Sequence, residues 1–300
     1  MSKISQLRKL AYSALLVNAL IWGAAFPIIK PVFDHINPMQ YLYFRFLAAG
    51  ILALPIFFWY YIKVRPKISY TIKVLLIELF GLPLPLWLLY TGLDQTSALE
   101  ASILSSLTPL FVTLGGIYFL KEKETKREWQ GLGLALVGSL LIVLEPLLNG
   151  HSIKGSSLSG NLYILGYNLI YTIYVIIAKK VYKKKPPVFF GALTYLATAA
   201  IYAILLNNDL PKLDLLTNPQ ILLPVLYMAI PGGIIAFALY LYSLSQIEAS
   251  EANLFTYLNG VVAIPAAAIL LQEYPTPLIL TAITLITYGV FRAESRKNML

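Results

Sequence analysis

The stretch TSALEASILSSLTPLFVTLGGIYFLKE, residues 96–122, has a counterpart 151 residues later in IEASEANLFTYLNGVVAIPAAAILLQE, residues 247–273. Each copy contains about 20 mostly apolar residues, which is the length that an α-helix needs to cross the hydrocarbon core of a bilayer. Each copy also carries a Glu-Ala pair near its start and ends on a glutamate, Glu122 or Glu273. The pair predicts two membrane-spanning helices in equivalent positions of an internal repeat.

The composition of the whole chain is typical of a membrane protein. Of its 300 residues, 58% are hydrophobic and 12% are charged, which is about half the charged share of a soluble protein. So few charges do not cover the surface of a soluble chain of this length. We therefore expect an all-α polytopic membrane protein. The chain has no cysteine, and His35 and His151 show no metal-ligand spacing, so we expect no metal and no cofactor.

Ten stretches are long and apolar enough to span a bilayer as helices. Their expected bounds are 11–30, 39–62, 72–92, 98–120, 129–148, 160–179, 188–206, 220–243, 251–271 and 276–292. The first stretch is not a cleavable signal peptide, because it is long, has no clear small-residue cleavage site and is followed at once by further spans.

The basic residues predict the orientation. With the N-terminus in the cytoplasm, 19 of the 23 Lys and Arg residues fall in cytoplasmic segments, three in outer loops and one inside a span. This distribution follows the positive-inside rule, so we expect a cell-membrane protein with both termini in the cytoplasm. The bilayer, with its anionic headgroups, explains the net charge of +9, and we expect no nucleic-acid partner.

The repeat extends beyond the opening stretch. The shift of 151 also superposes Gly138 on Gly289, and a shift of 149 superposes Pro38 on Pro187. Each copy holds five spans, an odd number, so the second copy enters the membrane from the opposite side. The expected repeats are residues 11–148 and 160–292, joined by the linker 149–159. Inverted repeats of this kind place a substrate site near the membrane midplane in many secondary transporters.

Several stretches resemble a known family. They are WGAAFPIIK (residues 22–30), residues 38–45, residues 96–122 with the glycines at 131, 133 and 138 that follow, and residues 247–273. From about residue 11 to 292 the pattern resembles the drug/metabolite transporter superfamily, in its ten-helix form with two EamA domains. The second copy departs from it where Tyr171 replaces Trp22 and Gly260 replaces Pro109. The resemblance implies gradient-driven export or exchange of small metabolites, commonly amino acids, and no enzyme activity.

Polar residues in the equivalent spans 4 and 9 are candidates for a substrate cavity. They are Ser102, Ser105 and Ser106 in the first copy, and Asn253, Thr256, Tyr257 and Asn259 in the second. The i, i+3, i+4 spacing puts three residues of each copy on one helix face. Polar stripes within a membrane face protein or water, so we expect the two stripes to face each other across a cavity. The alternative is helix packing, with the hydroxyls bonded to their own backbone.

Deep aromatic and polar residues extend the candidate cavity: Asn18, Trp22, Tyr90, Tyr171 and Tyr240. Trp22 and Tyr171 superpose under the repeat, and Asn18 lies one turn before Trp22. Their rings can stack on an organic solute or attract a cation. Core packing is the alternative for each of them.

Arg45 and Glu78 are charged residues inside spans. Intramembrane charges are costly and often functional, so both are candidates for coupling or gating. The alternative interpretation, which we favour from the sequence alone, is that both side chains extend to the nearer membrane surface. No deep carboxylate pair is visible, so proton coupling and facilitated diffusion both fit.

Small residues and prolines complete the pattern. Gly131, Ala135 and Ser139 recur at four-residue intervals, which is typical of close helix packing or of contact between two copies of the chain in a homo-oligomer. The prolines that interrupt spans are plausible bending points; they are residues 27, 83, 85, 109, 231 and 265.

The expected function is a secondary transporter for neutral, zwitterionic or cationic organic solutes, most of all an exporter of amino acids or related metabolites. A carrier of sugar-linked or phosphorylated metabolites is an alternative, although phosphate favours several basic residues in the cavity. A channel or an intramembrane enzyme is less compatible. No selectivity-filter signature is present, and neither histidine lies in a span.

Overall fold

The computed structural model describes residues 3–120, 126–148, 157–182, 191–247, 255 and 258–294, and these residues form helices and short connections without a strand. In chain order the helices are α1 (Lys3–Ile29), η1 (Lys30–Asp34), α2 (Pro38–Val64), α3 (Ile68–Gly81), α4 (Pro83–Gln95), α5 (Ala98–Ser105), α6 (Thr108–Leu120), α7 (Lys126–Leu148), α8 (Leu158–Tyr182), α9 (Gly191–Leu206), η3 (Asn207–Asp209), η4 (Leu213–Thr217), α10 (Pro219–Tyr227), η5 (Met228–Ile235), α11 (Ala236–Gln246), α13 (Leu258–Leu271) and α14 (Pro277–Glu294).

The described helices account for the ten expected spans. Six segments are long and apolar enough to cross a membrane, and four shorter apolar helices lie in the remaining positions, at Ala98–Val112, Trp129–Glu145, Leu258–Leu271 and Pro277–Gly289. Large apolar side chains on their outer faces are exposed, for example Ile204 at 76% and Ile269 at 80%. Such exposure is costly in water and favourable in lipid. The fold is therefore that of an all-α polytopic membrane protein.

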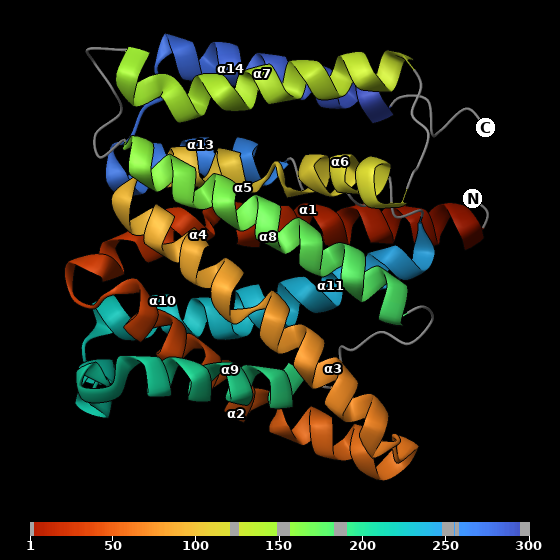
Figure 1. The fold of residues 1–300 in the computed structure, drawn as a ribbon, viewed down its shortest axis with the longest axis vertical. Helices are drawn as coiled ribbons and strands as arrows, with labels where there is room; N and C mark the ends of the chain where they lie inside the picture. Colours follow the sequence, from red (N-terminus) through yellow and green to blue (C-terminus); the bar gives the residue numbers. More distant parts are fainter. Residues whose placement is uncertain are drawn as a thin grey trace.

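The helices run roughly along one axis, and α1 begins at the same end of the bundle at which α14 ends (Figure 1). The second half begins at the other end, because α8 starts at the end opposite to the start of α1 (Figure 1). The two halves therefore enter the bundle from opposite sides, as five spans per half require.

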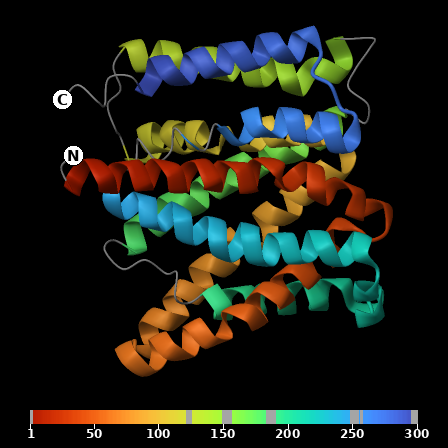
Figure 2. The same ribbon diagram turned by 180° about the vertical axis from the view of Figure 1, so that it is seen from behind.

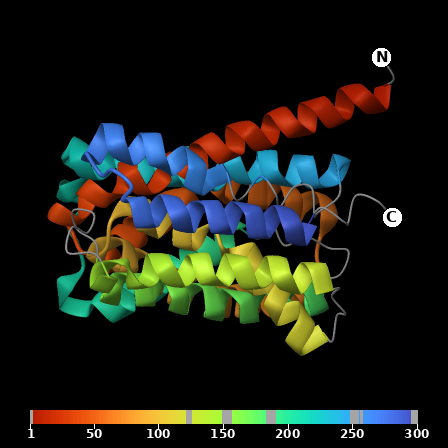
Figure 3. The same ribbon diagram turned by 90° about the horizontal axis from the view of Figure 1, so that it is seen from above.

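Helix contacts are paired between the halves. α1 packs against α11 and α13, and its counterpart α8 packs against α4, α5 and α6; Figure 2 shows α1 between α13 and α11. The remaining pairs join equivalent helices directly, α2 with α9 and α7 with α14, and Figure 3 shows α7 and α14 side by side. This is the arrangement that a two-fold relation between inverted repeats produces.

Two equivalent spans are interrupted. The third breaks at Leu82, between α3 and Pro83 at the start of α4, and the eighth passes through the π-helical segment η5 around Pro231. The shift of 151 superposes Leu82 on Gly233, inside η5. Proline lacks an N–H and clashes with the preceding turn, which explains both interruptions.

The fourth span also differs from the continuous helix that the sequence predicts. It divides into α5 and α6 at Ser106 and Leu107. Pro109 has no N–H for the carbonyl oxygen of Ser105, four residues before it. The Thr108 hydroxyl donates to that oxygen instead, at 2.7 Å, so the break leaves the carbonyl satisfied.

Candidate functional site

The Arg45 side chain lies inside the bundle. It is on α2, about two turns from the start of that helix, and its Nη1 donates to the Tyr90 hydroxyl at 2.6 Å. The guanidinium carbon is 5.1 Å from the ring centre of Phe46 and 5.4 Å from that of Tyr90. The interpretation that Arg45 extends to the membrane surface is therefore wrong, because the aromatic residues beside it hold the charge in the interior.

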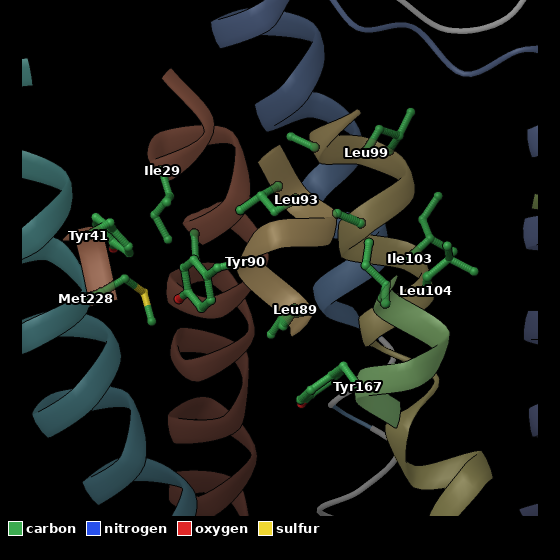
Figure 4. Packing of buried hydrophobic residues seen from close by; sticks show 14 of the residues in the cluster. Ile29, Tyr41, Leu89, Tyr90, Leu93, Leu99, Ile103, Leu104, Tyr167 and Met228 are labelled. Atoms are coloured by element: carbon green, nitrogen blue, oxygen red, sulfur yellow. The ribbon is translucent and has the colours of Figure 1, made fainter. Parts of the chain in front are cut away.

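Aromatic rings, most of them buried, surround this guanidinium. Tyr41 lies 5.4 Å from Tyr90 between ring centres, and Phe46 lies 5.6 Å from Tyr195 and 6.2 Å from Tyr202. Figure 4 shows the Tyr41 and Tyr90 side chains beside each other. These rings come from α2, α4 and α9, so the two interleaved halves of the chain build the Arg45 environment together.

Two of these phenols anchor the interrupted spans. The Tyr41 hydroxyl donates to the Pro224 carbonyl at 3.2 Å, and the Tyr202 hydroxyl donates to the Pro83 carbonyl at 2.7 Å. In contrast, the Tyr195 hydroxyl makes no hydrogen bond to a described residue. Arg45 thus lies between groups that fix the backbone and one phenol that is available to a solute.

Glu78 lies beside the break in the third span. The residue is 8% exposed, and its carboxylate accepts a hydrogen bond from the Tyr174 hydroxyl at 2.8 Å, so the side chain does not extend to the membrane surface as expected. The Tyr174 ring covers Gly81, where a Cβ would overlap it. Tyr171 lies 5.4 Å from Tyr174 between ring centres, which places a predicted cavity residue next to Glu78.

Asn18 and Trp22 bind the distorted backbone of the eighth span. Ala236 N–H bonds the carbonyl of Pro231, five residues back, as in a π-helix. The Gly232 carbonyl, its partner in a regular α-helix, accepts the Trp22 indole N–H at 2.9 Å. The Asn18 amide donates to the Ala236 carbonyl at 2.6 Å. These two residues of α1 therefore stabilise the interruption.

Trp22 also takes part in an aromatic contact with a second predicted cavity residue. Its ring centre is 6.0 Å from that of Tyr240, and both side chains are half-buried. The structure therefore brings Asn18, Trp22 and Tyr240 together at the eighth span. Arg45 and Tyr90 form a second group, between α2 and α4.

The serine stripe of the fourth span bonds to its own backbone. Ser102 donates to the Ala98 carbonyl, Ser105 to Ser102 and Ser106 to Ile103, at 2.7, 3.1 and 2.7 Å. Ser102 and Ser106 are buried and Ser105 is half-buried. These hydroxyls already have an acceptor, and each keeps lone pairs that can accept a further hydrogen bond.

The ninth span is described in part. Asn253, Thr256 and Tyr257 lie outside the described residues, so their cavity role stays a prediction. Asn259 is half-buried, and its Oδ1 is buried without a hydrogen-bond partner. A Cβ on Gly260 would lie 3.3 Å from Ser106 Oγ. The fourth and ninth spans therefore meet at this point.

A polar network fixes the end of the bundle at which α5 begins. Glu100, fully buried, accepts hydrogen bonds from Thr96 and Ser97 at 2.9 Å each and from the Asn161 amide at 3.1 Å. Ser97 is the N-cap of α5 and accepts from Glu100 N–H. An acidic residue in the first turn is stabilised by the helix dipole, so Glu100 stabilises the start of α5.

Glu273 links the two halves at the same end. Its two carboxylate oxygens accept the backbone N–H groups of Ala98 and Leu99 at 3.1 and 2.9 Å. Burial raises the pKa of Glu273, and these two donors oppose that rise. Lys30 Nζ donates to the carbonyls of Leu93 and Asp94 at 2.7 and 2.6 Å. The end of one helix and the start of the next are therefore both capped by charged side chains from elsewhere in the chain.

The sequence interpretation missed several interior residues. Tyr167, Tyr195, Asn161 and Asn168 were not singled out, although two amides within the apolar stretch 160–179 are a signal of internal contacts. Asn168 Oδ1 lies 2.8 Å from the Thr108 hydroxyl oxygen, and the Asn168 amide donates to the Leu104 carbonyl at 3.0 Å. Within the described residues, no group of three or more His, Cys, Asp or Glu side chains is placed to hold a metal ion.

Fold and interior together define a polytopic membrane protein with two inverted halves and paired interrupted spans. The model of the EamA-like transporter family matches twice, at residues 9–144 and 158–293. The chain belongs to this family. It is a membrane transporter and not an enzyme.

Curated relatives agree with this assignment. A "Probable amino-acid metabolite efflux pump" of Salmonella typhimurium is 27% identical, over 95% of this chain and 94% of its own. An "Uncharacterized transporter" of Archaeoglobus fulgidus is 24% identical, over 87% and 89%. "Uncharacterized inner membrane transporter YedA" of Escherichia coli strain K12 is 26% identical, over 84% and 80%. A protein of known crystal structure has the same fold, with a TM-score of 0.64 at 18% identity over 94% of this chain and 95% of that one.

Proposed function

We propose that this protein is a secondary transporter that exports small organic metabolites, amino acids or related neutral, zwitterionic or cationic solutes, by alternating access. The similarity to a probable amino-acid metabolite efflux pump supports the substrate class and the direction. The relative named as an inner membrane transporter and the basic residues of the short loops support a plasma-membrane location with cytoplasmic termini.

The paired interruption of the third and eighth spans carries the proposal. Leu82 and the η5 segment occupy equivalent positions of the two halves. Discontinuous helices in corresponding positions mark the substrate site in many secondary transporters, because they supply unpaired backbone groups and points of bending. Trp22, Glu78 and Tyr174 lie against these two interruptions, so a solute bound between them would contact the elements that move.

Proline substitutions test whether the interruptions are needed for transport. Pro83→Ala and Pro231→Ala restore the missing N–H groups and favour continuous helices. We expect both variants to keep their apparent Tm and to lose most transport. Pro55→Ala is the matched control, because Pro55 lies inside α2, which stays helical around it. Equal transport by all three variants and the wild type would contradict the role of the interruptions.

Counterflow separates a carrier from a channel. Proteoliposomes are preloaded with an unlabelled amino acid, and entry of the same labelled amino acid is measured against protein-free liposomes. A carrier shows saturable entry that depends on the internal amino acid. Linear entry that ignores the internal solute would indicate a channel and refute the proposal.

A carrier for phosphorylated or sugar-linked metabolites is the second candidate, and charge disfavours it. Dianionic phosphate groups are usually bound by several Lys or Arg side chains. Among the described residues the aromatic interior contains Arg45, whereas Lys30 is bonded to backbone carbonyls at the outer end of its span. Counterflow with a sugar phosphate as the internal solute is the corresponding test.

A further inference from the structure

We infer that Arg45, positioned by Tyr90, binds the carboxylate of the transported solute, so that the substrate is an organic molecule with a carboxylate and an apolar portion. The inference rests on the proposed transport function and adds the group by which the substrate is recognised. It also gives Arg45 a binding role in place of the coupling or gating role that the sequence suggests.

The charge of Arg45 lacks a counter-ion within the described residues. The guanidinium has five N–H donors, and its interactions with the described residues are one hydrogen bond to Tyr90 and the ring contacts with Phe46 and Tyr90. Charges inside a membrane are costly and are normally paired. A guanidinium with most of its donors unused therefore fits an anionic ligand that arrives from outside the chain.

The unused donors lie among the buried rings of the bundle interior. Among the described residues, the buried side-chain polar atoms without a partner are Thr198 Oγ1 and Asn259 Oδ1. Arg45 is half-buried, and its remaining nitrogens are not in that set. Their neighbours Tyr41, Phe46 and Tyr90 are at most 2% exposed. The guanidinium is thus packed beside rings of the bundle interior and not beside lipid-facing side chains.

Two further phenols of the interior are half-buried and keep a free hydroxyl among the described residues. The hydroxyls of Tyr171 and Tyr195 make no hydrogen bond to a described residue, and neither is among the fully buried atoms that lack a partner. The Tyr195 ring lies 5.6 Å from that of Phe46, which also lies beside the Arg45 guanidinium. These rings can cover the apolar portion of a solute while their hydroxyls bond its polar groups.

The repeat shows that the fold does not require a charge at this position. The shift of 149 superposes Arg45 on Thr194, and the Thr194 hydroxyl bonds the Gly191 carbonyl of its own helix. The two halves share the helix packing, yet one half alone carries the guanidinium. The asymmetry fits a role in binding a solute that is itself asymmetric.

The shape and number of donors select the carboxylate. Guanidinium presents two parallel N–H groups that match the two oxygens of a carboxylate. One interior cation balances one negative charge. The Tyr90 hydroxyl, held 2.6 Å from Nη1, is a positioning group that fixes the orientation of the guanidinium.

Binding to the purified protein in detergent tests the inference separately from transport. The probes are L-phenylalanine and L-leucine, their amides L-phenylalaninamide and L-leucinamide, and inorganic phosphate, each assayed by the rise in apparent Tm. We expect the two acids to stabilise the wild type, and the amides and phosphate to do so about 10- to 100-fold less effectively, since a charge-assisted pair is lost.

Variants then assign the effect to the residue. Arg45→Gln should lose the preference for acid over amide, and Arg45→Lys should keep part of it because the charge stays and the fork is lost. Tyr90→Phe should lower the affinity for the acids and leave that for the amides unchanged. Lys63→Gln is the matched control, since it removes a charge at the far end of α2, over the exposed Trp59, and should behave as the wild type.

Each outcome decides between the alternatives. Four results would each overturn the inference. Three concern the wild type: equal binding of acids and amides, binding of phosphate in place of the acids, or absence of any acid effect. The fourth is an unchanged preference for acid over amide in Arg45→Gln. If Arg45→Gln does not fold, the same comparison is made with Arg45→Lys and Tyr90→Phe. Failure of counterflow together with selective acid binding would refute transport and leave the carboxylate site standing.

Discussion

Gly138 and Gly289 occupy equivalent positions of the two halves, 151 residues apart. The residues that contact Gly138 are counterparts, under the same shift, of residues that contact Gly289. A Cβ on Gly138 would lie 2.7 Å from the Ala282 carbonyl oxygen, and one on Gly289 would lie 2.6 Å from the Gly131 carbonyl oxygen. Ala282 is the counterpart of Gly131 under the same shift. The α7–α14 contact is therefore reciprocal. The small-residue pattern of the fifth span includes residues that pack within one chain.

This contact predicts a difference between glycines of the same helix. Gly138→Ala and Gly289→Ala place a methyl group against the backbone of the facing helix, which should cost about 1–3 kcal/mol by overpacking. Gly133→Ala has no atom within 4 Å of the new Cβ and should be neutral or stabilise the protein by up to about 1 kcal/mol. The apparent Tm of the detergent-solubilised variants measures the order. Equal Tm values for Gly133→Ala and Gly138→Ala would contradict the reciprocal contact.

The sequence predicts the spans well, because their length and composition are set by the bilayer. The second expected span, 39–62, lies within α2, Pro38–Val64, and the sixth, 160–179, lies within α8, Leu158–Tyr182. Identities at a fixed shift also point to the equivalence of Gly138 and Gly289. Each of these properties depends on a local pattern or on a comparison of the chain with itself.

Contacts between distant residues were harder to predict. Asn18 bonds a carbonyl 218 residues away, and no local pattern names that partner. Pro231 marks an interruption, but whether it becomes a kink or a π-helix depends on the donor that Trp22 supplies to Gly232. The direction of the Arg45 side chain likewise depends on Tyr90, which another span provides.

Trp22 is expected to act through its N–H as well as its ring. Trp22→Phe keeps an aromatic ring and removes the donor to the Gly232 carbonyl, so it should lower stability by about 0.5–1.5 kcal/mol. Trp22→Ala removes the contact with Tyr240 as well and should cost more. Trp129→Phe is the control, because that side chain is 51% exposed. The apparent Tm and the counterflow rate are measured together; a Trp22→Phe variant identical to the wild type in both would show that the indole hydrogen bond is dispensable.

Glu273 is expected to stabilise the start of α5. Glu273→Ala leaves the N–H groups of Ala98 and Leu99 without their acceptors and should cost about 1–2 kcal/mol, as the loss of a helix cap does. Glu273→Gln keeps one acceptor oxygen and loses the charge, so its loss should be smaller. Asp214→Asn removes an exposed acidic charge from η4 and serves as the control. The Tm should be highest for Asp214→Asn, lower for Glu273→Gln and lowest for Glu273→Ala, and any other order would argue against capping.

The orientation in the membrane can be measured on this naturally cysteine-free chain. Lys67 lies in the turn between α2 and α3, whereas Leu213 begins η4 between α9 and α10, and both side chains are exposed. The basic residues place the first turn in the cytoplasm and the second connection outside, because short basic loops are retained on the cytoplasmic side. Leu213→Cys should therefore react with a membrane-impermeant maleimide in intact cells, and Lys67→Cys should react only after the membrane is opened. Each variant is a control for the other, since both are single cysteines at exposed connections. Labelling of Lys67→Cys alone in intact cells would reverse the orientation, and labelling of both would show that the two connections lie on the same side, against the span count.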